Sequence, residues 1–162
     1  MNSFILKGNI CYSISKTELA TVSGYVVCKD GKCAGVFEKL PEKYKDLEFR
    51  DLKDKLIIPG MVDLHIHAPQ YAFRGMGMDY ELIEWLNTQT FPEEAKYKDA
   101  DYAKKAYKIF ADNMKNSATT RACIFATRHR QATEILMDLM EETGLVTYVG
   151  KINMDRSAPD EL

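Results

Sequence analysis

Apolar and polar residues alternate in short runs over the first 58 residues, and longer helical periods appear only further along the chain. The runs with the β-branched and aromatic content of strands cover 4–12, 21–28, 32–37, 48–52 and 55–58. Between two of them, Asp30-Gly31 predicts a two-residue hairpin turn that places Cys28 directly opposite Cys33. This half of the pattern predicts a small β-domain.

From Met61 onward the pattern predicts strands that alternate with helices. Strands are expected at 61–67, 119–127 and 145–153, and helices at 80–87, 100–116 and 130–143. Asp79 is the expected N-cap of the first helix, Phe91-Pro92 its expected end, and Gly144 the residue that terminates the last helix. The order strand, helix, strand, helix, strand indicates parallel βαβ units.

Two histidines end the first of these strands. His65 and His67 are two residues apart, so on a strand their side chains point to one side, roughly 6.5 to 7 Å apart along the backbone. Two imidazoles so placed can converge on one ion with Zn–N bonds of about 2.0 to 2.1 Å. Pro69 then ends the strand, which puts the pair where α/β barrels carry their chemistry. A bare His-x-His also occurs as two ordinary polar residues at a strand end.

The residues around the pair narrow its interpretation. Pro59-Gly60-x-Val62-Asp63-x-His65-x-His67 resembles the first-strand signature of the amidohydrolase superfamily, whose members hydrolyse C–N and similar bonds with one or two metal ions in a (β/α)8 barrel. Further segments are similar to guanine deaminases of that superfamily, and they cover 67–75, 82–87, 90–94, 125–127 and 149–155. The resemblance extends over almost the whole chain and is weakest over the first fifty or so residues.

The resemblance implies a fold as well as a function. It predicts an α/β chain in which 59–162 form the first three or so βα units of a (β/α)8 TIM-type barrel, preceded by a small N-terminal β-sandwich segment over 1–58. Such a barrel typically needs about 250 residues. We therefore expect the chain to be the N-terminal portion of a longer enzyme.

The implied activity is zinc-dependent hydrolysis of guanine to xanthine and ammonia. By resemblance His65 and His67 are metal ligands and Gln70 is the guanine-binding glutamine, whereas the remaining ligands and the proton-shuttling glutamate are expected beyond Leu162. The 162 residues alone are accordingly not expected to turn over guanine. Iron is an alternative to zinc, since imidazole suits both metals.

Two polar residues beside the histidines have open roles. The amide of Gln70 offers a donor and an acceptor, which suits the mixed edge of a purine, although a loop glutamine that faces water is the alternative. Asp63 shares the strand face of the pair, so it could orient an imidazole or serve as a buried structural carboxylate.

Four other candidates are weaker. Arg74 is either a substrate-loop cation or a solvated arginine, and Trp85 is either a substrate platform or a packing residue. Glu93-Glu94 resembles the first turn of a helix more than an acid/base dyad. His129 stands between two arginines, which disfavour a further cation, so we do not expect it to bind metal.

Composition excludes other classes of function. The net charge is −2 with both signs interspersed, which argues against nucleic-acid binding, and the four cysteines match no zinc-finger or redox spacing. The absence of a membrane-length apolar run or a leader pattern predicts a soluble, cytoplasmic protein. Without a nucleic-acid-binding surface, the purine that the resemblance implies as substrate would be met as a free base. By resemblance the full-length enzyme could form a homodimer. The alternatives are an aminohydrolase for a triazine, pterin or cytosine, and a non-catalytic interaction module.

Overall fold

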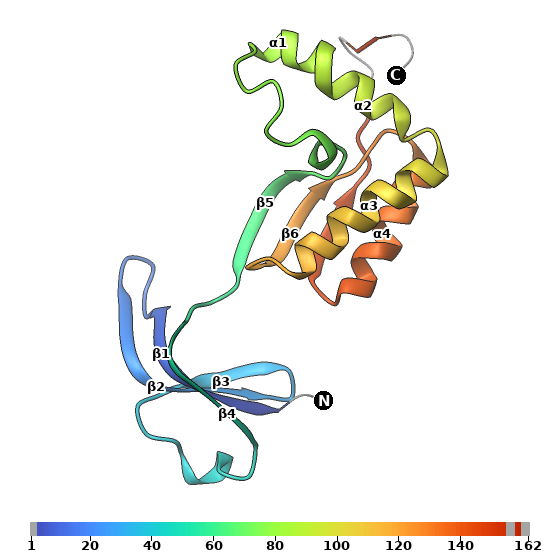
Figure 1. The fold of residues 1–162 in the computed structure, drawn as a ribbon. Coiled ribbons are helices and arrows are strands. Elements are labelled where there is room, and N and C mark those ends of the chain that lie inside the picture. The colour runs from blue at the N-terminus through green and yellow to red at the C-terminus, as the bar shows by residue number, and fades with distance from the viewer. Residues whose placement is uncertain (1–2, 155–157, 160–162) are drawn as a thin grey trace. The chain divides into compact units, whose positions relative to one another are not determined.

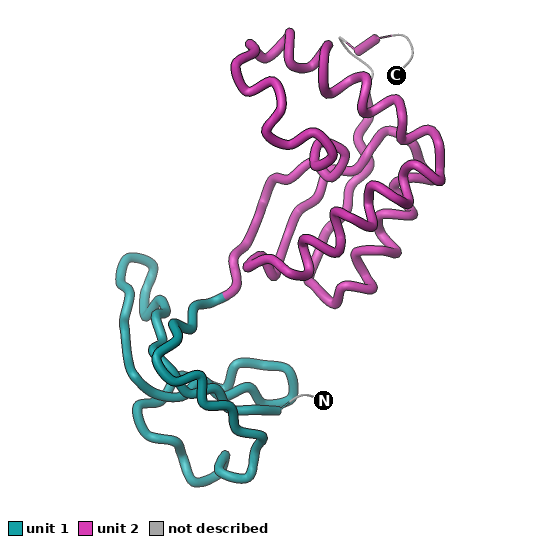
Figure 2. The backbone as a smooth tube through the Cα atoms, viewed as in Figure 1, with its two compact units in different colours: residues 1–59 teal, residues 60–162 magenta. Residues whose placement is uncertain are grey.

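The computed structural model describes residues 3–154 and 158–159. The chain divides into two compact units, Met1–Pro59 and Gly60–Leu162, which Figure 2 shows in different colours. Each unit has its own sheet.

The first unit is a four-stranded sheet in the order β3-β2-β1-β4 (Figure 1). Its elements are β1 (Phe4–Ser13), β2 (Leu19–Lys29), β3 (Lys32–Phe37), the 3-10 turn η1 (Glu42–Tyr44) and β4 (Glu48–Ile57). β1 lies antiparallel to β2 and parallel to β4. The prediction of two strands at 48–52 and 55–58 is wrong, because both runs belong to β4. A register shift along β4 and a positive φ of 57° at Lys53 explain why the apolar pattern breaks there.

The hairpin between β2 and β3 is confirmed. Asp30 and Gly31 have φ values of 52° and 77°, the positive values that a two-residue turn of this kind requires, and Cys28 lies directly opposite Cys33. The described residues of this unit form one sheet. The β-sandwich therefore stays a prediction, since a sandwich needs a second sheet.

The second unit is built on three parallel strands in the order β5-β6-β7. They are β5 (Met61–His67), β6 (Thr119–Phe125) and β7 (Val146–Gly150), and the helices α3 (Ala100–Lys115) and α4 (Arg130–Thr143) connect them. Both helices lie against one face of the sheet, where Phe110, Ile124 and Leu136 belong to a single buried core (Figure 1). The predicted βαβ order is confirmed. The motif residue Asp155 lies outside the described residues.

A long excursion separates β5 from α3. It contains the 3-10 helix η2 (Pro69–Phe73), followed by α1 (Leu82–Trp85), the π-helical turn η3 (Leu86–Thr90) and α2 (Phe91–Lys96). The predicted helix at 80–87 is wrong at both ends: α1 begins after Glu81, not after an Asp79 cap, and the helical path continues through Pro92. Pro92 is tolerated because the π-helical turn η3 shifts the hydrogen bonds just before it, where the Phe91 N–H donates to the carbonyl of Leu86.

The end of α4 depends on one glycine. Gly144 has φ 73°, and its N–H donates to the carbonyl of Glu141, which confirms the predicted terminator. A Cβ at Gly144 would meet no atom within 4 Å, so Gly144→Ala tests the backbone strain alone. We expect it to lower the free energy of unfolding by about 1 kcal/mol. The control is Gly150→Ala, where the Cβ space is also open and φ is not positive; equal losses in urea titrations of the two variants would contradict this explanation.

None of the helices in the described part of the chain combines the length and the apolar character that crossing a membrane requires.

Candidate active site

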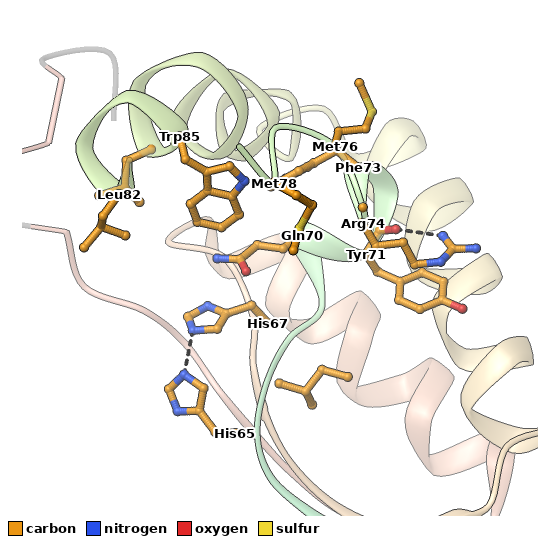
Figure 3. A pocket seen from close by; sticks show the side chains of 13 residues that line it. His65, His67, Gln70, Tyr71, Phe73, Arg74, Met76, Met78, Leu82 and Trp85 are labelled. Atoms are coloured by element: carbon orange, nitrogen blue, oxygen red, sulfur yellow. Dashed lines mark hydrogen bonds between the residues drawn. The ribbon is translucent and has the colours of Figure 1, made fainter. Parts of the chain in front are cut away.

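The two histidines converge at the end of β5. Their Nε2 atoms are 3.2 Å apart and their ring centroids 5.0 Å apart, and Figure 3 shows the two rings directed toward each other. His65 is exposed and His67 is half-buried. The strand geometry expected from their spacing thus places both imidazoles together.

An aromatic side chain from the next strand supports both rings. Phe125, at the end of β6, stands opposite His67 in the parallel register. Its ring stacks on that of His67 with centroids 4.8 Å apart and planes 18° apart, and it lies 4.7 Å from the His65 ring. Phe125 carries no local sequence signal for this contact, because the register between two strands so far apart in the chain cannot be seen in either segment alone.

The distance between the two nitrogens fits one metal ion. Two Zn–N bonds of tetrahedral geometry separate their nitrogens by about 3.3 to 3.4 Å, close to the 3.2 Å observed. Burial, and then the charge of His65, lower the pKa of His67, which favours the neutral imidazole that binds metals. No cluster of three or more His, Cys, Asp or Glu side chains suited to a metal occurs among the residues that the structure describes. The pair offers two imidazole nitrogens, one fewer than the three protein ligands that a catalytic zinc normally takes.

Asp63 and His129 have other places in the structure. The Asp63 carboxylate accepts the backbone N–H of His65 at 3.0 Å, so it fixes the strand beside the pair and contacts the backbone rather than an imidazole. His129 is the N-cap residue of α4 and does not line the pocket beside the pair. Burial, and then Arg128, lower the pKa of His129.

A pocket of about 660 Å³ opens beside the two histidines. It is lined by residues of β5, η2, the following loop, α1 and the start of η3, and its wall includes Gln70, Tyr71, Phe73, Arg74, Met76, Met78, Leu82, Trp85 and Leu86. Gln70 is half-buried, and its side-chain amide makes no hydrogen bond to any residue in the described ranges. The amide is therefore available to a ligand in the same hollow as the histidines (Figure 3).

Arg74 and Trp85 also line this pocket. The Arg74 guanidinium lies over the Tyr71 ring at 4.0 Å and donates to the Tyr71 carbonyl at 2.9 Å, so part of its hydrogen bonding is used locally. Trp85 is half-buried and packs against Phe73, with ring centroids 5.7 Å apart. Trp85 thus packs and forms pocket wall at once, so the two alternatives are not exclusive.

A comparison with known protein families identifies the family to which these parallel strands and this histidine pair belong. The family model described as the amidohydrolase family matches residues 56–161. The chain belongs to the amidohydrolase family. It has the fold of that family, and membership implies a divalent metal ion without indicating which one.

Individual members of the amidohydrolase family are similar along nearly the whole chain. A guanine deaminase of Dictyostelium discoideum is 33% identical over 178 residues, an alignment that covers 96% of this chain and 39% of that protein. The crystal structure of guanine deaminase from C. acetobutylicum, with guanine bound in its active site, superposes with a TM-score of 0.92 at 44% identity, covering 99% of this chain and 39% of that one. E. coli guanine deaminase gives a TM-score of 0.82 at 30% identity, covering all of this chain and 39% of its own. The chain thus spans about two fifths of these relatives.

Proposed function

We propose that these residues supply the first part of the active site of a zinc-dependent guanine deaminase, which hydrolyses guanine to xanthine and ammonia. His65 and His67 bind the metal ion, and Gln70 binds the purine. The remaining ligands and the proton shuttle come from outside the 162 residues, so the chain alone does not turn over. The ion is zinc in this proposal, with iron as the alternative.

One observation carries the proposal: the two Nε2 atoms lie 3.2 Å apart on the wall of the same pocket as the Gln70 amide, which has no hydrogen-bond partner among the described residues. A catalytic zinc lowers the pKa of its bound water to about 7, which supplies hydroxide at neutral pH. The chain's own part is to hold two ligands at the required separation and to orient the substrate beside them. Similarity to three guanine deaminases, one with guanine bound, supports the choice of purine.

We infer that β5, β6 and β7 are the first three strands of a (β/α)8 barrel that begins near residue 59, and that residues 1–58 contribute one sheet of a β-sandwich. The parallel order β5-β6-β7 supports the first part. The enzyme would act on free guanine in the cytoplasm, either alone or as a homodimer.

A hybrid polypeptide tests the function. Residues 1–162 are followed by the part of the C. acetobutylicum enzyme that this chain does not cover, and ammonia release is measured with guanine. We expect turnover by the zinc-loaded hybrid and none by the 162-residue chain. A hybrid that unfolds cooperatively and binds zinc but leaves guanine intact would contradict the assignment of guanine as the substrate. Turnover by the 162-residue chain would contradict the proposal that the remaining ligands and the proton shuttle come from outside these residues.

The Gln70→Ala variant of the hybrid tests the purine contact. Loss of a hydrogen bond to a buried ligand costs about 1 to 3 kcal/mol, so KM for guanine should rise by roughly 5- to 150-fold. The control is Gln131→Ala, which removes an exposed glutamine of α4 away from the pocket. An unchanged KM in Gln70→Ala would favour another heterocycle, and triazines, pterins and cytosine would then be assayed.

A further inference from the structure

A buried carboxylate outside the pocket sits at the junction of three segments. Glu94, in the first turn of α2 as the sequence predicted for Glu93-Glu94, is only 3% exposed. Burial raises the pKa of Glu94 against the opposing effect of its hydrogen bonds to Thr127 and Arg128. Placing a carboxylate here is unfavourable unless it is hydrogen-bonded, so its partners indicate what it does.

The partners of Glu94 are the residues that directly follow β6. Its carboxylate accepts the backbone N–H of Arg128 at 3.0 Å and a hydrogen bond from the side chain of Thr127, which is fully buried. The Thr127 hydroxyl in turn accepts the N–H of His129, the N-cap residue of α4, at 3.3 Å. The His129 side chain makes no cap hydrogen bond. The start of α4 is therefore held in place by Glu94 of α2, which acts through Thr127.

The hydrogen bonds of Glu94 thus form a linkage between α2 and the residues after β6, and both of these segments connect to the pocket. On one side, α2 continues α1 and η3, and these carry Leu82, Trp85 and Leu86 in the pocket wall. On the other side, Phe125 stands two residues before Thr127 and packs on both histidines. Next to α2, the Tyr97 hydroxyl also donates to the carbonyl of Pro69, beside Gln70, at 3.4 Å.

We propose that Glu94 is a positioning residue: its buried carboxylate fixes the helical wall that carries Trp85 against the β6 end that carries Phe125. Glu94 does not line the pocket and touches no reacting group. Its role is to set the separation between the wall and the histidine pair. The consequence for guanine binding rests on the proposed function, whereas the structural linkage does not.

The linkage is tested in the 162-residue chain, because Trp85 is its only tryptophan and reports on the wall. In Glu94→Ala we expect a red-shifted Trp85 emission, stronger quenching by acrylamide and about tenfold faster amide exchange over 91–96, equivalent to about 1.4 kcal/mol. Glu94→Gln keeps an oxygen that can accept the Arg128 N–H and should restore the emission. The control is Glu141→Ala, an exposed glutamate of α4.

If Glu94→Ala does not fold, Thr127→Val replaces it, because valine keeps the shape and removes the hydroxyl. Unchanged emission, quenching and exchange in whichever of the two variants folds would overturn the proposal. In the hybrid, Glu94→Ala should raise KM for guanine about tenfold and leave kcat within about twofold. A hybrid without guanine turnover defeats the proposed function only, since the Trp85 measurements are independent of substrate.

Discussion

Replacing His65 or His67 by alanine is expected to remove the metal ion and with it the activity of the hybrid enzyme. Each substitution deletes one of two nitrogens that lie 3.2 Å apart, and the remaining imidazole cannot chelate alone. Removing a residue that only hydrogen-bonds to a metal ligand already costs about 10- to 100-fold in metal affinity or activity. Loss of a ligand itself should therefore reduce the rate by more than about 100-fold. Zinc content and ammonia release are measured on the same samples.

The third histidine of the chain provides the matched control. His129 does not line the pocket, so His129→Ala should retain its zinc and a rate within about twofold of the unmodified hybrid. Equal losses of zinc in all three variants would point to general destabilisation. Full zinc content and full activity in His65→Ala or His67→Ala would refute the assignment of the pair as ligands.

The largest effect on stability is expected from Phe110→Ala. Phe110 is 0% exposed in the core between α3 and the sheet, and its ring meets that of Tyr71 edge-on with centroids 5.4 Å apart. Truncation of a buried phenylalanine leaves a cavity and costs about 3 to 5 kcal/mol, a large share of the roughly 5 to 15 kcal/mol that stabilises a typical domain. Urea unfolding followed by Trp85 emission measures the loss.

Substitution of Ile109, the neighbour of Phe110 in α3, separates the effect of losing a buried side chain from the effect of alanine on the helix. Ile109 lies in the same turn of α3 but is 50% exposed, so Ile109→Ala should change the free energy of unfolding by less than about 1 kcal/mol. Tyr71 contacts Phe110 and follows Gln70, so Phe110→Ala should also loosen the part of the pocket wall that carries Gln70. Similar losses in the two variants would show that the core is not packed as described.

The parts of the fold that were predictable from sequence are those with a local periodic signal. α4 begins at Arg130 and ends before Gly144 as its apolar spacing indicated, and α3 begins at Ala100 where its own apolar spacing placed it. The histidine pair was predictable for the same reason, because a two-residue spacing on a strand fixes the side on which both rings lie.

What the sequence did not predict depends on contacts between distant segments. The stacking of Phe125 on His67 requires the register of two parallel strands, and the burial of Glu94 requires the loop after β6 to fold over α2. The path through Pro92 was missed for another reason: the π-helical turn η3 shifts the hydrogen bonds just before the proline, so the usual stop signal does not end the helix.

The most direct test is anomalous diffraction at the zinc edge from crystals of the zinc-loaded hybrid. A single strong peak about 2.0 to 2.1 Å from Nε2 of both His65 and His67, on the pocket side of β5, is the predicted result. A peak elsewhere, or two imidazoles that turn away from each other with no ion between them, would contradict the account.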